Sequence, residues 1–430
     1  MSRTEITTLG DSKSEADLDC LARCSNYSDE EIWEVLSLVG VCAHKYGSSS
    51  MRIEGYLKSL AEHFGYRAQV ECSPDQLQVT LTKDDYGWRK SECFHVAGDV
   101  ELHKLSLIGD VVTKLELGSI SPTAVVRHLK AIDRMQPVWG SRLVLFGYVA
   151  VAFGLPGIIG GNWLDTLLAP MLSILTFFIV QCSSRWNVQL QPWMPFVSTF
   201  SVGLVAAVVS AWLPAINSVI VIVSATAIIL PGYSISLGVS ELAAAKWRSG
   251  WINLSIGMLC MTKMVIGAWA SLNLISPSLS LSVAPYSLPS VHQYWFTILF
   301  PILIVGLNVV FQVSRRDFLS VTLVAVIAFV AYLMGGQLSG THLGALLGSL
   351  IAALLASEWS TRTGRPSSVV MVPVVVMLVS GTIGFRGLVN ITDGDVTLGL
   401  EQFSQTFTVA LTIMLGLWVG HRIRKPLMTL

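Results

Sequence analysis

The chain has little charge for its length. Of its 430 residues, 28 are basic and 28 are acidic, so charged residues make up 13% of the chain while hydrophobic residues make up 52%. Soluble globular domains carry roughly twice that charged share. The formal net charge is zero and no basic run is present, which argues against nucleic acid as a partner. The composition predicts an integral membrane protein.

Motifs for common catalytic chemistry are also missing. The sequence contains no Walker loop, zincin motif or nucleophile elbow. Its seven cysteines are odd in number and fall mostly in the first hundred residues, which indicates reduced thiols and not a disulfide framework. Cys20 and Cys24 have no second Cys/His pair at zinc-ligand spacing. We therefore expect no cofactor, no metal and no enzymatic activity.

The remaining charge is concentrated at the front of the chain. Residues 1–142 hold 37 of the 56 charged side chains. No long apolar run appears before about Val138, so we expect no signal peptide and a cytosolic front region. We predict a disordered tail over residues 1–27 and a small α+β cytosolic domain over residues 28–137.

Local patterns predict the elements of this cytosolic domain. Ser28 and Glu31 form a capping box that opens a helix through Lys45. Amphipathic spacing and alternation then predict a helix, three strands and two further helices. These elements cover residues 50–64, 67–72, 76–82, 92–96, 101–117 and 122–135.

The tract from residue 143 onward divides into ten apolar runs, each long enough to span a membrane. Their approximate centres are Val151, Ile174, Val205, Ala225, Lys263, Val305, Ile327, Leu350, Val376 and Ile413. With the amino terminus inside, the inner loops and tail carry ten Lys or Arg residues, while the outer loops carry only Arg386. This bias predicts a multi-pass protein of the plasma (inner) membrane with both termini in the cytosol.

The ten runs divide into two halves of five, and five is odd, so the halves would have opposite orientations. Sliding the fourth and fifth runs onto the ninth and tenth by 149 residues aligns glycines and a tryptophan without a gap. The aligned pairs are Gly232 with Gly381, Gly238 with Gly387, Gly250 with Gly399, Gly267 with Gly416 and Trp269 with Trp418. We predict two inverted five-helix repeats over residues 138–276 and 294–430, joined by an extracytoplasmic linker over residues 277–293.

Two of these runs are interrupted at corresponding places. Residues 230–233 (LPGY) break the fourth run and residues 379–382 (VSGT) break the ninth. Breaks free backbone groups that must meet protein, water or substrate in lipid. Kinks packed by neighbouring helices are the alternative. The candidate substrate-binding residues are Pro231, Gly232, Ser380 and Gly381, which would shape the pocket, and Ser234, Ser236 and Thr382, which would supply hydroxyls.

Two charged residues complete the candidate site. Lys263 lies twelve residues past Trp251, about 18 Å into its helix, where a cation is costly and could hold a substrate carboxylate. A shorter helix that ends near Lys263 is the alternative. Glu241 is a candidate for proton coupling, unless it is a solvated loop charge.

Several motifs together resemble the threonine/serine exporter family. Residues 46–54 (YGSSSMRIE) and 60–65 (LAEHFG) resemble its cytosolic start. Residues 230–232 (LPG) with Gly238 and Gly250 resemble the end of its first membrane half, and residues 378–381 (LVSG) with 384–387 (GFRG) resemble its second. The resemblance runs from about Asp29 to Arg424. It implies a cytosolic domain, ten spans and export of small amino acids such as threonine and serine. Relatives often have proline where Ser380 stands, so a softer second break is expected.

We interpret the chain as a secondary active transporter that exports a threonine- or serine-like amino acid, coupled to protons by alternating access. Its expected partners are this substrate, membrane lipid and protons, and a homo-oligomer is left open. The alternatives are a channel, a carrier for another small organic acid, a membrane-anchored cytosolic enzyme, and a structural or signalling membrane protein.

Overall fold

The computed structural model describes residues 27–83, 87–96, 98, 100–187, 189–275, 289–291, 295–378 and 381–425. Residues 1–26 of the expected tail (residues 1–27) and most of the expected linker over residues 277–293 lie outside these ranges. The chain divides into two compact units. Unit 1 contains the residues up to Gln136 together with Trp359–Ser368, and unit 2 contains Pro137–Glu358 with Val369–Lys425.

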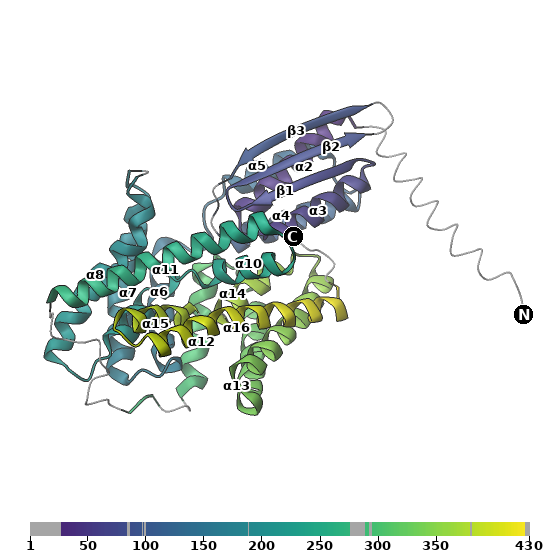
Figure 1. Cartoon of the computed structure of the whole chain (residues 1–430). Coiled ribbons are helices and arrows are strands. Elements are labelled where there is room, and N and C mark those ends of the chain that lie inside the picture. The colour runs from purple at the N-terminus through teal and green to yellow at the C-terminus, as the bar shows by residue number, and fades with distance from the viewer. Residues whose placement is uncertain are drawn as a thin grey trace, which may run out of the picture. The chain divides into compact units, whose positions relative to one another are not determined.

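Unit 1 is a three-stranded antiparallel sheet with helices packed against it (Figure 1). The strand order is β1-β2-β3, with Val79 of the central strand opposite both Val70 and Glu92. In chain order the elements are α2 (Asp29–Lys45), α3 (Ser50–His63), β1 (Arg67–Ser73), β2 (Gln76–Lys83), β3 (Trp88–His95), α4 (Leu102–Glu116) and α5 (Pro122–Asp133). The predicted order of helices and strands is therefore confirmed.

The local signals in the sequence explain where these elements begin and pack. The Glu31 amide donates to the Ser28 hydroxyl at 3.2 Å, and the Ser28 amide donates to the Glu31 carboxylate at 3.0 Å, which caps α2 as predicted. Leu77, Val79 and Leu81 alternate along β2 and are fully buried, as the period of a strand requires. A Cβ on Gly40 would lie 2.7 Å from Leu57, so glycine lets α2 pack closely on α3.

An ion pair at the end of this unit is supported by a second hydrogen bond to the same carboxylate. Asp133 accepts from the Lys45 ammonium at 2.6 Å and from the Tyr46 hydroxyl. These two bonds lower the pKa of the Asp133 carboxyl below its usual value. Both residues of the salt bridge are about two-fifths exposed, so solvent screens its contribution to stability.

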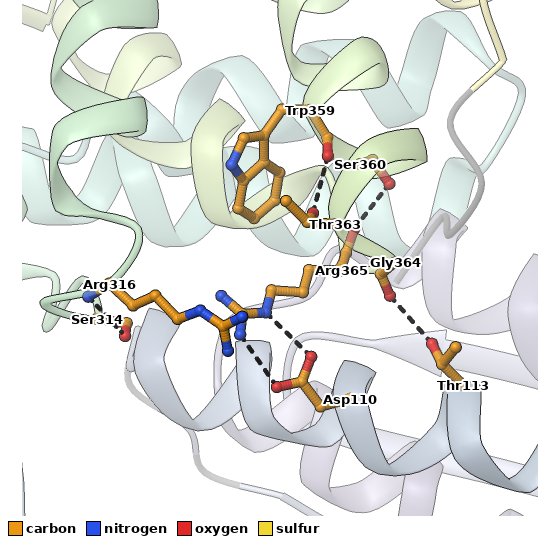
Figure 2. Close-up of polar contacts among 9 residues, drawn as sticks. All are labelled: Asp110, Thr113, Ser314, Arg316, Trp359, Ser360, Thr363, Gly364 and Arg365. Carbon is orange, nitrogen blue, oxygen red and sulfur yellow. Dashed lines mark hydrogen bonds and ion pairs between the residues drawn. The ribbon is translucent and has the colours of Figure 1, made fainter.

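A second segment, far along the chain, belongs to unit 1. Residues 359–368 connect α13 to α14 and pack on α4 (Figure 2). The Arg365 guanidinium makes a two-pronged ion pair with Asp110, with N–O distances of 3.0 and 3.2 Å. The Thr113 hydroxyl donates to the Gly364 carbonyl at 3.0 Å. The Arg365 side chain is 7% exposed, so this segment is firmly held by the N-terminal domain.

Unit 2 is helical throughout its described residues. Its first half contains α6 (Ser141–Ile158), α7 (Trp163–Ser183), η1 (Gln191–Trp193), α8 (Met194–Trp212), α9 (Ser218–Ala225), η2 (Ala227–Ile229), α10 (Gly232–Ala243) and α11 (Trp247–Ile275). Its second half contains α12 (Phe296–Val310), α13 (Phe318–Thr363), α14 (Ser368–Leu378), α15 (Gly381–Thr392) and α16 (Val396–Ile423). The last residues of α13 enter unit 1.

Many of these helices suit a membrane. Among the described residues, seven are long and apolar enough to cross one, when α14 and α15 are taken together as Ser368–Thr392. The pair α9 and α10, bent by 62°, makes an eighth candidate, and α12 is a shorter apolar helix. The chain is thus a polytopic helical membrane protein with a small α+β domain in front.

The longest helix, α13, is two arms joined at a sharp turn. Its 46 residues would extend about 69 Å if straight, twice the ~30 Å hydrocarbon core. Ser339 and Gly340 leave helical geometry, and Gly340 has a φ of 79°, which glycine adopts without strain. A Cβ on Gly335 would lie 2.8 Å from the Gly344 Cα, so the two arms pack against each other.

Close helix packing recurs at positions 149 residues apart. A Cβ on Gly238 would lie 2.6 Å from the Leu254 amide, and a Cβ on Gly387 would lie 2.8 Å from the Phe403 amide. Small residues permit this approach of helix backbones. The hairpin of α10 and α11 is therefore packed in the same way as the hairpin of α15 and α16.

The third apolar run of each half likewise packs closely against a glycine of the fifth run. Gly267 of α11 faces Thr199 and Phe196 of α8, whereas Gly416 of α16 faces Ser349 and Leu346 of the second arm of α13. Both pairs of partners differ by 150 residues. In addition, α10 packs on α16 and α11 packs on α15, so each half contacts the other through corresponding elements.

Candidate functional site

The fourth apolar run is broken where the sequence places proline and glycine. α9 ends at Ala225, the short η2 follows, and α10 begins at Gly232 at a 62° angle. In the other half, α14 ends at Leu378 and α15 begins at Gly381. Val379 and Ser380 lie outside the described residues, so the prediction of a softer break there is not tested.

Gly381 of α15 lies against Gly232 of α10. A Cβ built on Gly381 would lie 3.1 Å from the Cα and 3.4 Å from the amide nitrogen of Gly232. Both glycines are buried. A side chain on Gly381 would push the two backbones apart. Glycine at these two aligned positions therefore lets α10 and α15 approach closely.

A cavity of about 350 Å³ lies at this junction. Gly232, Gly381 and Thr382 line it at the breaks. α6, α12, the first arm of α13 and the end of α14 supply mainly aliphatic and aromatic side chains, among them Phe300, Phe329 and Tyr332. An apolar cavity with a few polar groups is typical of a small-molecule site.

α10 begins at this cavity. Pro231 is the residue before α10, and its side chain has no oxygen to cap the helix. The amino end of a helix carries a partial positive charge. The start of this 12-residue helix therefore favours negative charge in the cavity.

Arg386 adds a full positive charge. It lies in α15, and among the described residues that line the cavity it is the only charged one. Its Nη1 donates to the Ile159 carbonyl at the end of α6, at 3.3 Å. The sequence pattern predicts an outer-loop position for Arg386. The structure instead places it within a helix and at the cavity wall.

The predicted hydroxyl residues separate into two groups. Thr382 lines the cavity, whereas Pro231, Ser234 and Ser236 are outside the lining. Ser236 is 6% exposed, and its hydroxyl makes no hydrogen bond within the described part of the chain. Gly232, Gly381 and Thr382 are thus the predicted residues that the fold brings together.

Lys263 lies away from the cavity. Its ammonium donates to the Pro192 carbonyl at 3.0 Å and lies 5.5 Å from the centre of the Trp193 ring. α11 continues to Ile275, so Lys263 is not at the end of a short helix. Its long side chain instead reaches the start of α8, next to a tryptophan, as snorkelling cations do.

Glu241 is fully buried between α10 and α11. Its carboxylate accepts from the Ser249 hydroxyl at 2.6 Å and from the Asn253 amide at 2.8 Å. The aligned position in the second half holds Asn390, which donates to Gln402 at 2.9 Å. The same two positions are therefore bonded in both halves, but only the first half has an ionisable group there.

Sequence reasoning missed most of the cavity wall. The aromatic residues of α12 and α13 look like ordinary lipid-facing or core residues in an apolar run. Phe300 and Phe329 stack on each other, and Tyr332 stacks on Phe329. Arg386 could have been found, because a charge within four residues of a helix break is a signal for a polar site.

Comparison with known families agrees with this architecture. Residues 34–275 match one model of threonine/serine exporters, and residues 297–423 match a second, described as "Threonine/Serine exporter, ThrE". The chain belongs to the threonine/serine exporter family. Membership supports a role in membrane transport and amino-acid export, and the resemblance seen in the sequence motifs is confirmed.

The chain is also similar to a curated protein. An uncharacterised protein of Schizosaccharomyces pombe is 23% identical over 382 residues, which cover 84% of this chain and 44% of the relative. The chain thus spans less than half the length of that relative. No solved structure matches the chain.

Proposed function

We propose that this threonine/serine exporter family member is a secondary active transporter that exports small amino acids across the plasma membrane. The observation that carries the proposal is the cavity lined both by Gly232, at the broken fourth run, and by Gly381, at the aligned position of the other half. A site at the interface of two repeats is accessible to both sides in turn when the halves rock against each other. Gly232, Gly381 and Thr382 supply backbone and hydroxyl groups to the wall of this cavity.

The proposal includes ten spans arranged as two inverted repeats. Eight candidate spans become ten when α12 is counted and α13 is divided at Gly340. The glycine contacts of one hairpin recur at aligned positions in the other hairpin, which supports the repeat. An odd number of spans in each half makes the repeats antiparallel in the membrane.

Contacts on one side support an inner position for both termini. Trp139, which precedes α6, donates to the Val313 carbonyl at 2.8 Å, next to Arg315. Arg424 at the end of α16 pairs with Glu358 near the end of α13. These are the connections that carry Lys and Arg, which favour the cytosol.

Proton coupling is assigned to Glu241. It is a buried carboxylate in a helix that starts at the cavity, and its contacts to Ser249 and Asn253 are polar groups that tolerate either protonation state. A buried ionisable residue within a membrane span is a natural proton carrier.

Purified protein in liposomes tests the proposal. Liposomes loaded with unlabelled threonine or serine take up external labelled threonine by exchange, and the uptake saturates with concentration. A pH gradient accelerates net efflux, and a protonophore removes this acceleration. Protein-free liposomes are the control. Flux that rises linearly with concentration and shows no exchange would indicate a channel, and absence of any flux from folded protein would contradict amino-acid export.

A further inference from the structure

We propose that Arg386 binds the carboxylate of the transported molecule. The cavity then selects short monocarboxylates by their carboxylate group, and an ammonium group on the ligand contributes little to binding. The inference deepens the proposed function and rests on it for the location of the site. It assigns to Arg386 the role that the sequence alone gives to Lys263.

The first argument is the number of free donors on Arg386. A guanidinium has five N–H donors and cannot lose its charge in a protein. Within the described residues, Arg386 makes one hydrogen bond, to the Ile159 carbonyl. This bond is 3.3 Å long and fixes the side chain against the end of α6. The planar group therefore keeps donors for a two-pronged contact with a carboxylate at the cavity wall.

The second argument is the sign of the charge around the cavity. Arg386 lies five residues after Gly381 in α15, and its side chain lines the same cavity as Gly232 at the amino end of α10. The described lining contains no Asp or Glu to balance them. A positive cavity of low polarity favours one anionic group and disfavours a second cation.

The third argument is the chemistry of the remaining wall. It is mostly aliphatic and aromatic, with hydroxyl groups from Thr382, Tyr233 and Tyr332. Such groups hydrogen-bond a ligand hydroxyl or ammonium but do not neutralise an ammonium charge. A ligand that keeps the carboxylate and loses the ammonium group should therefore retain most of its affinity, whereas the reverse change should remove it.

Three matched ligands test this selection on the wild-type protein. Threonine, 3-hydroxybutyrate and threoninol share one carbon skeleton, but 3-hydroxybutyrate lacks the ammonium group and threoninol lacks the carboxylate. Binding to the full chain in detergent is measured by calorimetry, without any transport step. We expect 3-hydroxybutyrate to bind within about tenfold of threonine and threoninol to bind at least about tenfold more weakly, since charged hydrogen bonds have this strength.

Two variants test the residue. Arg386→Gln should weaken threonine binding by roughly 10- to 100-fold, and Arg386→Lys should recover part of the loss because it keeps the charge without the fork. Lys263→Gln is the matched control, because it removes a cation that lies within a membrane helix but away from the cavity, and it should leave binding unchanged. Circular dichroism and size-exclusion chromatography establish that each variant is folded.

Each outcome decides the inference separately from the proposed function. Threoninol binding as tightly as threonine, or a folded Arg386→Gln variant with wild-type affinity, would overturn it. Loss of binding in Lys263→Gln alone would also overturn it, in favour of Lys263. If wild-type liposomes show no threonine exchange while 3-hydroxybutyrate binds in an Arg386-dependent manner, amino-acid export fails and the carboxylate site stands.

Discussion

The two membrane halves share their packing but not their chemistry. The hairpin of α10 and α11 and the hairpin of α15 and α16 place glycines against the same backbone atoms, as Gly250 and Gly399 show by facing Leu242 and Ile391. The polar residues differ. Glu241 aligns with Asn390, and Arg386 aligns with Leu237. The scaffold is therefore symmetric, while the charges that would bind substrate and protons are divided between the halves.

One contact shows how closely the packing is maintained. In the first half, Gly257 of α11 faces Ile235 of α10. At the aligned positions of the second half, Thr406 of α16 faces Gly384 of α15. The small residue has moved to the other helix, but each hairpin keeps one glycine per contact. Each hairpin thus keeps a close helix contact at this place, although the residues at both aligned positions differ between the two halves.

The largest expected effect comes from closing the point where the halves meet. We expect Gly381→Val to reduce exchange by more than about tenfold, because its side chain would contact the Gly232 backbone and occupy the cavity. The measurement is the initial rate of threonine exchange in liposomes. Gly336→Val is the control, since nothing lies within 4 Å of a Cβ at that position. Full activity in Gly381→Val would mean that the junction is not the pathway.

The symmetry of the packing can be tested with a pair of alanines. Gly238→Ala and Gly387→Ala each place a methyl group within 3 Å of a backbone nitrogen. We expect each to destabilise the protein by about 1–3 kcal/mol, and by similar amounts. The measurement is the midpoint of thermal unfolding in detergent, with Gly336→Ala as the unstrained control. A large effect in one half alone would contradict equivalent packing.

The sequence predicted the order of helices and strands in the N-terminal domain and the presence of several apolar helices after it. Helix caps such as Ser28 and alternation such as Leu77 to Leu81 are local signals, and they determine local structure directly. The aligned glycines predicted the corresponding contacts because close helix packing requires a missing side chain at a fixed place.

The candidate site was harder to predict because it is assembled from segments far apart in the chain. Gly232 and Gly381 could be paired by the repeat, but nothing local shows that α6, α12 and α13 complete the wall. Lys263 looked buried because depth along a helix says nothing about the direction of its side chain. The sequence pattern predicts an outer-loop position for Arg386 because the apolar run ends before it, whereas Arg386 lies within α15 and lines the cavity.

A smaller and more specific effect is expected from Glu241, the ionisable residue that the second half lacks. Glu241→Gln keeps an oxygen that can accept from Ser249 and Asn253 but cannot carry a proton. We expect exchange within about threefold of wild type and no acceleration of net efflux by a pH gradient. Asn390→Ala is the control in the other half and should keep the pH dependence. Gradient-driven efflux in Glu241→Gln would exclude it as the proton carrier.

The smallest expected effect concerns the segments of chain that precede α9 and α14. The segment before α9 is held within the membrane unit, where the Asn217 amide donates to Asp165 at 2.8 Å. The corresponding segment before α14 belongs to the N-terminal unit and is held there through Asp110 and Arg365. The two halves thus use an aspartate for the same task but take it from different units. A change in the N-terminal unit should therefore act on residues 359–368 and leave the segment before α9 untouched.

Asp110→Asn tests this difference. Asp110 is 32% exposed, so we expect a loss of about 1 kcal/mol and faster hydrogen exchange in residues 359–368, with the segment before α9 unchanged. The measurement is hydrogen–deuterium exchange of the full chain by mass spectrometry. The double variant with Arg365→Gln should lose less than the sum of the two single losses, because both substitutions remove the same ion pair. If Asp110→Asn also loosened residues 213–217, the two approaches would be coupled and the asymmetry between the halves would be lost.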